Sequence, residues 1–356
     1  MRAAGEPLLI EDVDVGEPGA QEVLIDVAAV GLCHSDLVFL DGSYQQAVPA
    51  VLGHESAGVV ARVGKGVGRV QPGDRVITSL SASCGRCAYC RESLPHLCSR
   101  KDLTRRGSSE PPRLTQGGEE VHQFLDLSSF AERMLVHEST VVRIPSEVPT
   151  DRAALLGCGV ATGLGAIFNT ARVQRGQSVC VIGCGGVGLA AIQGARIAGA
   201  SQVIAVDTMP EKLEVARSLG ATDVVDANFQ DPIEAVRQLA DGEGVHHSIE
   251  AFGSVSTAEQ AFAILRRGGT ATVVGLIPGQ ELSIPTDQLF YERKIQGSVM
   301  GSNDFQRDTR RYIDMYLDGA LNLDDLVTQH LTLEEINRGF DDMRSGTGVR
   351  SIVVFE

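Results

Sequence analysis

The sequence predicts an α/β protein with two domains, one built on a doubly wound parallel β-sheet and one mainly on antiparallel strands. Its 356 residues exceed the length at which a single hydrophobic core keeps growing. Residues 177–300 alternate short β-branched runs with helical patterns, a rhythm typical of βαβ units. The preceding segment contains strands broken by Gly, Pro and Asp turns, which indicates a twisted antiparallel domain.

Apolar runs and turn residues place the individual elements, although the N-terminal residues 1–13 leave the first strand uncertain. The expected strands lie at 22–32, 57–64, 73–79, 177–183, 202–207, 223–226, 246–253, 270–276 and 350–356. The expected helices lie at 184–198, 211–220, 231–242, 256–269, 307–319 and 333–346.

The charge balance and the N-terminus limit the partners of the chain. A formal net charge of −15 repels a phosphate backbone, so we expect no nucleic-acid partner. The first residues are acidic and do not resemble a secretory signal, and the most apolar segments are rich in Gly and contain Gln193 and Arg196. We therefore expect a cytoplasmic protein with no membrane partner.

Four of the eight cysteines, Cys84, Cys87, Cys90 and Cys98, lie within fifteen residues in the pattern C-x2-C-x2-C-x7-C. Disulfides are rare in a reducing compartment, whereas four thiolates fill the tetrahedral shell of a structural zinc. An iron–sulfur cluster is an alternative, but the C-x3-C-P that usually follows is missing. A zinc ribbon that binds nucleic acid is another, and the acidic composition argues against it.

A dinucleotide-binding turn is predicted where Gly183, Gly185 and Gly188 follow a strand and begin a helix. Such a turn brings backbone close to a pyrophosphate at a helix N-terminus. Asp207 ends the next expected strand, where its carboxylate favours NAD over NADP. The alternative is a glycine-rich turn that only packs a helix on a strand. We interpret Cys180 and Cys184 as small buried hydrophobes.

Three further candidates are scattered along the chain: Cys33 in GLCHSD, His54 in LGHESAG and Cys158 in LLGCGVATG. From the residues alone, each is more readily a structural side chain than a metal ligand.

The combined motifs, however, resemble those of the zinc-dependent medium-chain alcohol dehydrogenases. GLCHSD, GHE, the four-cysteine lobe, GCGVATG, GCGGVGL and the Asp207 strand end occur in the order found in that family. The resemblance covers essentially the whole chain and extends to VHQFLDLSSFAERMLV and GVRSIVVFE, which look like the class I and class III branch and its bacterial relatives. It implies a GroES-like catalytic domain at 1–160 and 301–356, a Rossmann domain at 161–300, and a homo-oligomer, either dimer or tetramer.

The resemblance also implies two zinc ions per chain. Cys33, His54 and Cys158 become the ligands of a catalytic zinc with one open position, and the four-cysteine lobe holds a structural zinc.

Three neighbours of these ligands have implied roles. Asp36 hydrogen-bonds His54, Glu55 lies behind the zinc, and Ser35 hydrogen-bonds the substrate hydroxyl and begins proton removal. Val38 stands where well-known animal enzymes have a proton-relaying His, so the rest of the proton path is not assigned.

The implied NAD contacts cover the nicotinamide, the pyrophosphate and the adenosine ribose. Thr162 and Val187 press on the nicotinamide, His34 and Arg350 face the pyrophosphate, and Lys212 joins Asp207 at the ribose. The full expected set is His34, Thr162, Gly183, Gly185, Gly186, Val187, Gly188, Asp207, Lys212 and Arg350.

The implied substrate pocket is apolar, which favours a hydrophobic primary alcohol, whether aliphatic, allylic or aromatic. Its expected lining is Tyr44, Leu80, Leu103, Phe124, Leu125 and Leu276. The resemblance thus implies an oxidoreductase that transfers a hydride between a small-molecule alcohol and NAD, giving an aldehyde or ketone. We expect the segment 100–120 to determine specificity.

Other functions stay open. One is a thiol-dependent formaldehyde dehydrogenase acting on glutathione or mycothiol adducts, since LLGCGVATGLGAIFNTA is similar to bacterial enzymes of that kind. Others are a nicotinoprotein that keeps NAD bound and a non-catalytic binding protein that retains the fold.

Overall fold

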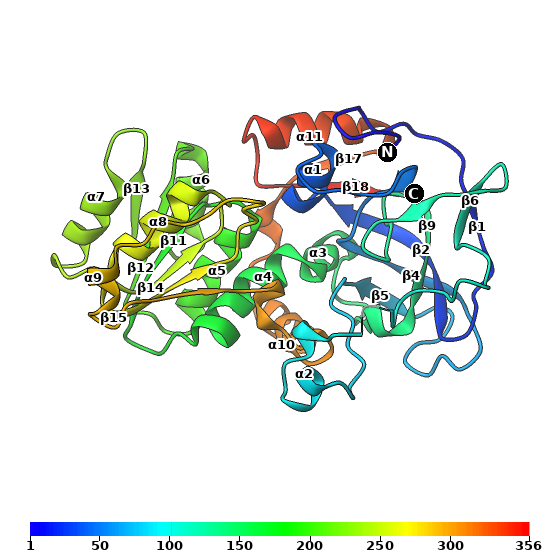
Figure 1. Cartoon of the computed structure of the whole chain (residues 1–356), viewed down its shortest axis with the longest axis horizontal. Coiled ribbons are helices and arrows are strands. Elements are labelled where there is room, and N and C mark those ends of the chain that lie inside the picture. Colours follow the sequence, from blue (N-terminus) through cyan, green and yellow to red (C-terminus); the bar gives the residue numbers. More distant parts are fainter. Residues whose placement is uncertain (101, 356) are drawn as a thin grey trace. The chain divides into compact units, whose positions relative to one another are not determined.

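The computed structural model describes residues 1–100 and 102–355, which form two compact units (Figure 1). The first unit comprises Met1–Cys158, Asp304–Asp318 and Val327–Glu356, and the second comprises Gly159–Asn303 and Gly319–Leu326. The boundaries expected from the sequence, 160 and 301, stay a prediction. The expected segment 100–120 and the expected last strand include residues 101 and 356, which lie outside the described residues.

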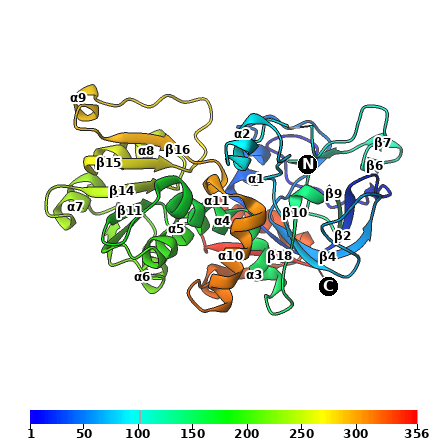
Figure 2. The same cartoon turned by 90° about the horizontal axis from the view of Figure 1, so that it is seen from below.

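The second unit contains a parallel sheet, in which the described residues form six strands in the order β13-β12-β11-β14-β15-β16. Figure 1 labels β12 and β13, and Figure 2 labels β16 at the other end of this order. Counted along the chain this is the order 3-2-1-4-5-6 of a doubly wound dinucleotide-binding sheet. The predicted α/β class with a parallel sheet is therefore confirmed. The strands are β11 (Ser178–Ile182), β12 (Gln202–Asp207), β13 (Asp223–Asp226), β14 (Val245–Glu250), β15 (Leu265–Val273) and β16 (Lys294–Gly297).

Helices connect these strands and pack against them. Strand β11 is buried along its whole length, as expected of a central strand covered on both faces, and Cys180 and Cys184 are both fully buried beside it. The helical segments of this unit are α4 (Gly159–Gly165), the π-helical η4 (Ala166–Ala171), α5 (Gly186–Ile197), α6 (Pro210–Ser218), α7 (Pro232–Leu239), α8 (Val255–Ala263), α9 (Thr286–Leu289), η5 (Met300–Ser302) and η6 (Asp324–Leu326).

The expected helix at 256–269 is wrong at its C-terminal end. Helix α8 ends at Ala263, and β15 begins two residues later at Leu265. Gly268 has φ +72, a left-handed conformation that a continuing helix does not contain. The edge strand β16 was not expected, because its sequence KIQG has no clear alternation of apolar and polar residues.

The first unit contains a mainly antiparallel sheet, and within the described ranges its order is β10-β5-β4-β2-β18-β17, with β9 also paired to β2. The C-terminal strand β18 pairs with β2, and Val327–Glu356 is part of this unit. The strands are β2 (Glu22–Gly31), β4 (Ser56–Val63), β5 (Arg75–Thr78), β9 (Arg133–His137), β10 (Val141–Arg143), β17 (Val327–Leu331) and β18 (Arg350–Val354).

Smaller elements complete this unit around a core that includes Phe124, Phe130 and Phe340. The short strands are β1 (Asp14–Val15), β3 (Ala50–Val51), β6 (Leu114–Gln116), β7 (Glu119–Glu120) and β8 (His122–Gln123). The helices are α1 (His34–Leu40), α2 (Ala88–Arg91), α3 (Thr150–Ala154), α10 (Phe305–Leu317) and α11 (Ile336–Arg344), with the 3₁₀ turns η1 (Pro95–Leu97), η2 (Glu138–Thr140), η3 (Leu155–Gly157) and η7 (Leu333–Glu335).

Among residues 1–100 and 102–355, no single helix is long and apolar enough to cross a membrane. One bent pair of helices, Thr150–Gly157 with Gly159–Ala171, passes the same test of length and composition, as buried core helices also do.

Candidate functional site

Three side chains that are far apart in sequence meet in the first unit. Cys33 is the N-cap residue of α1, His54 lies between β3 and β4, and Cys158 directly follows η3. One potential ligand atom from each lies within 4.8 Å of the other two, and all three residues are buried. Two sulfurs and one imidazole nitrogen at this spacing can hold a zinc ion and leave a fourth position free.

A hydrogen bond fixes the orientation of the His54 ring. Nδ1 of His54 lies 3.0 Å from Oδ1 of Asp36, which also accepts from the backbone N–H of Gly53 at 3.1 Å. Asp36 Oδ2 accepts from the N–H of Cys33 at 3.3 Å. Since Nδ1 is bonded to a carboxylate, Nε2 is the ring nitrogen left for a ligand, and this buried atom has no hydrogen-bond partner in the described part of the chain. A metal ion bound beside the two sulfurs would satisfy it.

The thiols of Cys33 and Cys158 affect each other's pKa. A hydrogen bond from Cys158 lowers the pKa of the Cys33 thiol, and the same contact raises the pKa of Cys158, which burial raises further. A bound cation would favour the thiolate form of both cysteines, because metals bind the deprotonated form.

Glu55 and Arg350 form a buried ion pair behind this centre. Burial raises the pKa of Glu55 to about 7, while the guanidinium of Arg350 opposes that shift. Arg350 was expected to face the cofactor pyrophosphate, and its pairing with Glu55 was not expected. The pair places a positive charge close to Cys33 and Cys158, where it favours their thiolates.

The first turn of α1 carries the other residues expected near the reacting hydroxyl. Ser35 is half-buried and His34 is exposed, and they are the first two residues after the candidate metal ligand Cys33. Val38 is half-buried one turn further along the same helix.

The glycine-rich turn has the geometry that a dinucleotide requires. Gly183 has φ +94, and Gly185 is the N-cap of α5, whose first residues are Gly186 and Val187. A Cβ on Gly188 would lie 1.8 Å from the carbonyl oxygen of Gly183, so only glycine permits this approach of helix to strand.

Asp207, at the end of β12, accepts three backbone hydrogen bonds. Its Oδ2 accepts from the N–H of Cys184 at 2.6 Å, and its Oδ1 accepts from the N–H groups of Thr208 and Met209 at 2.8 and 2.9 Å. These bonds hold the carboxylate at the glycine-rich turn. The other two expected cofactor contacts are Lys212, half-buried in α6, and Thr162, buried in α4.

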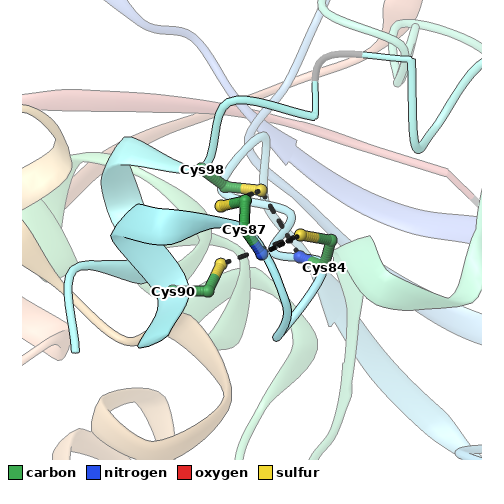
Figure 3. A group of neighbouring side chains, drawn as sticks. All are labelled: Cys84, Cys87, Cys90 and Cys98. Carbon is green, nitrogen blue, oxygen red and sulfur yellow. Dashed lines mark hydrogen bonds between the residues drawn. The ribbon is translucent and has the colours of Figure 1, made fainter. Parts of the chain in front are cut away.

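The four-cysteine lobe gathers its sulfur atoms around one point (Figure 3). All four sulfurs lie within 4.8 Å of one another, and backbone N–H groups of Cys84 and Cys87 donate to sulfurs at 3.4 Å. Backbone hydrogen bonds lower the pKa of Cys87 to about 5. The donors and the four-sulfur shell fit a closed, structural zinc site.

A row of aromatic rings leads from the surface to the candidate metal ligand His54. Tyr44 is 37% exposed and stacks on Phe39 with ring centroids 5.3 Å apart. Phe39 meets Phe124 edge-on at 4.9 Å, and the fully buried Phe124 meets His54 at 5.8 Å. Phe39 was not predicted as a site residue from the sequence. The only sequence signal for it is its position on α1, shortly after the CHSD motif.

The remaining expected pocket residues are leucines with different exposures. Leu80, Leu103 and Leu125 of the first unit are half-buried, and Leu80 and Leu125 pack against the core that contains Phe124. Leu276 of the second unit is 42% exposed.

Each arginine between residues 100 and 113 is engaged by a carboxylate of the same chain. The pairs are Arg100 with Asp102, Arg105 with Asp126, Arg106 with Glu22 and Arg113 with Glu22. This segment therefore offers no unpaired guanidinium to an anionic substrate in its described residues.

Comparison with known proteins relates this geometry to two family models. Residues 19–146 match the model described as alcohol dehydrogenase GroES-like domain, and residues 186–317 match the model described as zinc-binding dehydrogenase. An S-(hydroxymethyl)glutathione dehydrogenase from Synechocystis sp. is 38% identical over an alignment of 356 positions. The alignment covers 98% of this chain and 96% of the relative.

Two solved structures are similar over the whole chain. The alcohol dehydrogenase zinc-binding domain protein from Burkholderia ambifaria has a TM-score of 0.94 and 35% identity, covering 100% of this chain and 97% of its own. The benzyl alcohol dehydrogenase from Acinetobacter calcoaceticus has a TM-score of 0.93 and 32% identity, covering 100% and 98%.

Proposed function

The chain belongs to the zinc-dependent medium-chain alcohol dehydrogenase family and is an NAD-dependent enzyme, and on that premise we propose that it oxidises hydrophobic primary alcohols, aromatic or allylic ones above all, to aldehydes. The observation that carries the proposal is the row of rings from Tyr44 through Phe39 and Phe124 to His54. Aromatic side chains favour an apolar or aromatic ligand by area and by ring geometry.

The proposed roles of the chain's own groups follow from their positions. Zinc bound by Cys33, His54 and Cys158 would supply a Lewis acid that makes an alcohol hydroxyl more acidic. Asp36 holds Nδ1 of His54 by a hydrogen bond, which leaves Nε2 as the ring nitrogen that faces the ligand cluster. Ser35 is the proposed first acceptor of the hydroxyl proton.

Cofactor binding is assigned in the same way. The turn from Gly183 to Gly188 and the side chain of His34 would bind the pyrophosphate. Asp207 and Lys212 would bind the adenosine ribose. Thr162 and Val187 would contact the nicotinamide. The pairing of Arg350 with Glu55 limits Arg350 to a shared role, with one face of the guanidinium on the carboxylate and the other toward the cofactor.

A panel of alcohols tests the substrate class. We expect kcat/KM with NAD to be at least roughly tenfold higher for benzyl and cinnamyl alcohol than for ethanol, since burying a large apolar group contributes about 1.5–3 kcal/mol. Phe39→Leu should reduce this preference, and Phe229→Leu, which changes a phenylalanine that is 84% exposed in the second unit, should leave it intact. A preference for ethanol in the unmodified enzyme would contradict the proposal.

A second candidate is oxidation of S-(hydroxymethyl)glutathione or the mycothiol adduct, which the name of the 38% identical relative supports. The carboxylates of such a substrate require cations, and the arginines of segment 100–113 are already paired. Assays of formaldehyde with glutathione, with mycothiol and with neither thiol separate the two candidates. Thiol-dependent NADH formation that exceeds the rate with benzyl alcohol would favour the second.

The proposal includes a homo-oligomer, dimer or tetramer, in the cytoplasm, with exchangeable NAD. Light scattering on the zinc-loaded protein tests the oligomeric state, and fractionation of cells tests the cytoplasmic location. Release of a stoichiometric nucleotide from the purified protein on denaturation would instead indicate a nicotinoprotein.

A further inference from the structure

We propose that the second unit contains a binding site for a small phosphate-bearing anion at the amino ends of β11, β14 and β15. A cavity of about 200 Å³ lies there. Its lining consists of Gln177, His246, His247, Arg266, Arg267, Gly268 and Gly269. The glycine-rich turn proposed for NAD follows the opposite, carboxyl end of β11, so the two sites are separated by the length of that strand.

An interruption of the sheet creates the cavity. Val245 pairs with Leu265, but the next pair is His247 with Thr270, so four residues of β15 face a single residue of β14. The extra residues 266–269 have the sequence RRGG and leave the regular ladder. Gly268, with φ +72, turns this segment, and its N–H donates to the carbonyl of Tyr291 at 3.0 Å. The bulge therefore places two adjacent arginines, Arg266 and Arg267, near the amino end of β15.

The charge at this place is unbalanced. Within residues 1–100 and 102–355, no carboxylate lies within 4.0 Å of a guanidinium nitrogen of Arg237, Arg266, Arg267 or Arg293. Arg293 lies near Arg237 and Arg267: burial and then the charges of these two arginines lower the pKa of Arg293, and the charge of Asp287 opposes that shift. Uncompensated arginines are unexpected in a chain with 46 acidic and 31 basic residues. A bound anion would remove their mutual repulsion.

The cationic groups are also held in place. Nη1 of Arg266 donates to Nε2 of His246 at 2.6 Å, and Nδ1 of His246 lies 2.8 Å from Oγ of Ser178. Arg267 lies over the ring of Tyr291, with its guanidinium carbon 4.5 Å from the ring centroid. Both guanidinium groups therefore keep unused N–H donors while their directions are fixed, which lowers the entropic cost of binding.

Polar atoms of the lining lack partners. Oε1 of Gln177 accepts from the N–H of Gln174 at 2.8 Å and from Nε2 of His247 at 3.0 Å, and this orients the Gln177 amide. In the part of the chain that the structure describes, the Gln177 NH₂ group makes no hydrogen bond. Nδ1 of His247 is also buried without a partner, but it is an acceptor when Nε2 donates to Gln177, so it adds no donor to the cavity. The cavity thus offers N–H donors of Gln177, Arg266 and Arg267, and phosphate oxygens can accept hydrogen bonds from them.

The shape of the donors selects the ligand class. Guanidinium groups bind phosphate through paired N–H groups, and two of them side by side suit an anion with more than one charge. A cavity of about 200 Å³ admits a pyrophosphate group rather than a large molecule. The pyrophosphate can be free or part of a nucleotide, and both present the same chemistry to this site.

Titration calorimetry on the zinc-loaded full chain tests the proposal, in a phosphate-free buffer with saturating NADH to fill the dinucleotide site. Inorganic pyrophosphate should bind with one site per chain. The double variant Arg266→Gln/Arg267→Gln should lose at least roughly tenfold in affinity, a loss of about 1.4 kcal/mol. The matched control Arg310→Gln/Arg311→Gln removes the same charge from two adjacent exposed arginines of α10 and should bind as the unmodified enzyme does.

Comparison of pyrophosphate with ADP separates the two sources. Equal affinities would mean that the phosphates alone are recognised, and tighter binding of ADP would mean that a nucleotide is the ligand. Absence of pyrophosphate binding, or equal affinity in the 266/267 variant and the control, would overturn the proposal. A second measurement needs no variant: pyrophosphate should protect Arg266 and Arg267, but not Arg310, from phenylglyoxal in the unmodified enzyme, as mapped by mass spectrometry.

Discussion

Nδ1 of His54 lies 3.0 Å from Oδ1 of Asp36, and both side chains are completely buried. The carboxylate holds the one ring nitrogen as a donor, and the other ring nitrogen is therefore available between Cys33 and Cys158. The orientation of the proposed zinc ligand depends on a residue that does not itself bind the metal.

Asp36→Ala should weaken zinc binding at the three-residue centre by roughly 10–100-fold, as loss of a carboxylate behind a metal-bound histidine usually does. Asp36→Asn keeps an acceptor oxygen and should have a smaller effect. Zinc retention against a chelator, followed with a colorimetric indicator, measures both. Asp12→Asn, which changes an exposed carboxylate, serves as the control, and equal zinc retention in Asp36→Ala and the control would contradict the assigned role.

Cys87→Ser should remove one of two zinc ions and leave the other bound. The four sulfurs of the lobe lie within 4.8 Å of one another, so loss of one opens the closed shell. Metal analysis should fall from two zinc ions per chain to about one, with a lower melting temperature. Cys180→Ala alters a buried cysteine outside both clusters and should keep two ions. A stoichiometry of two in Cys87→Ser would rule out the lobe as a zinc site.

The two clusters also show what sequence can predict. The four cysteines of the lobe are close in sequence, so their spacing alone indicates a metal site. Cys33, His54 and Cys158 come together only through the packing of α1, the segment before β4 and the turn after η3, and spacing could not reveal that contact. Only the resemblance to a family predicted it. The Glu55–Arg350 pair, which joins the segment before β4 to the C-terminal strand, was missed for the same reason.

Local patterns predicted the parallel sheet well because each strand and helix carries its own apolar period. They failed at residues 264–269. The helical pattern STAEQAFAILRR predicts that the helix continues there, but α8 ends at Ala263 and β15 begins at Leu265. Pairing of β15 with β14 and β16 overrides the local preference there. The arginines of the proposed anion site lie in this misassigned segment, so sequence patterns gave no indication of the cavity.

Asp207→Asn should reduce the preference for NAD over NADP. The carboxylate stands at the glycine-rich turn, where its charge repels a 2′-phosphate, and the variant keeps one acceptor oxygen for the neighbouring backbone. We expect kcat/KM to fall roughly tenfold with NAD and to rise with NADP. Steady-state kinetics with both cofactors measures the ratio, and the melting temperature checks the fold. An unchanged ratio in a folded variant would remove Asp207 from the ribose site.

Glu22→Gln should destabilise the first unit at neutral pH by about 3 kcal/mol, because it leaves two guanidinium groups without their anion. Glu22 is 3% exposed and accepts from Nε of Arg106 at 2.9 Å and from Nε of Arg113 at 2.8 Å. Burial alone would raise the pKa of Glu22, but hydrogen bonds from Arg106, Gly19 and Arg113 lower it from 4.5 to about 2.

The sign of the pH dependence follows from this lowered pKa. The carboxylate binds fewer protons in the folded state, so its contribution is fully present above the unfolded value of 4.5 and is lost as the pH falls toward 2. Melting temperatures should therefore differ most between the unmodified enzyme and Glu22→Gln near neutral pH and converge in acid. Glu17→Gln alters a carboxylate that is 78% exposed in its pair with Arg62 and should stay within about 0.5 kcal/mol of the unmodified enzyme. A gap between Glu22→Gln and the unmodified enzyme that stayed constant with pH would show that the ionised carboxylate is not what holds Arg106 and Arg113 in place.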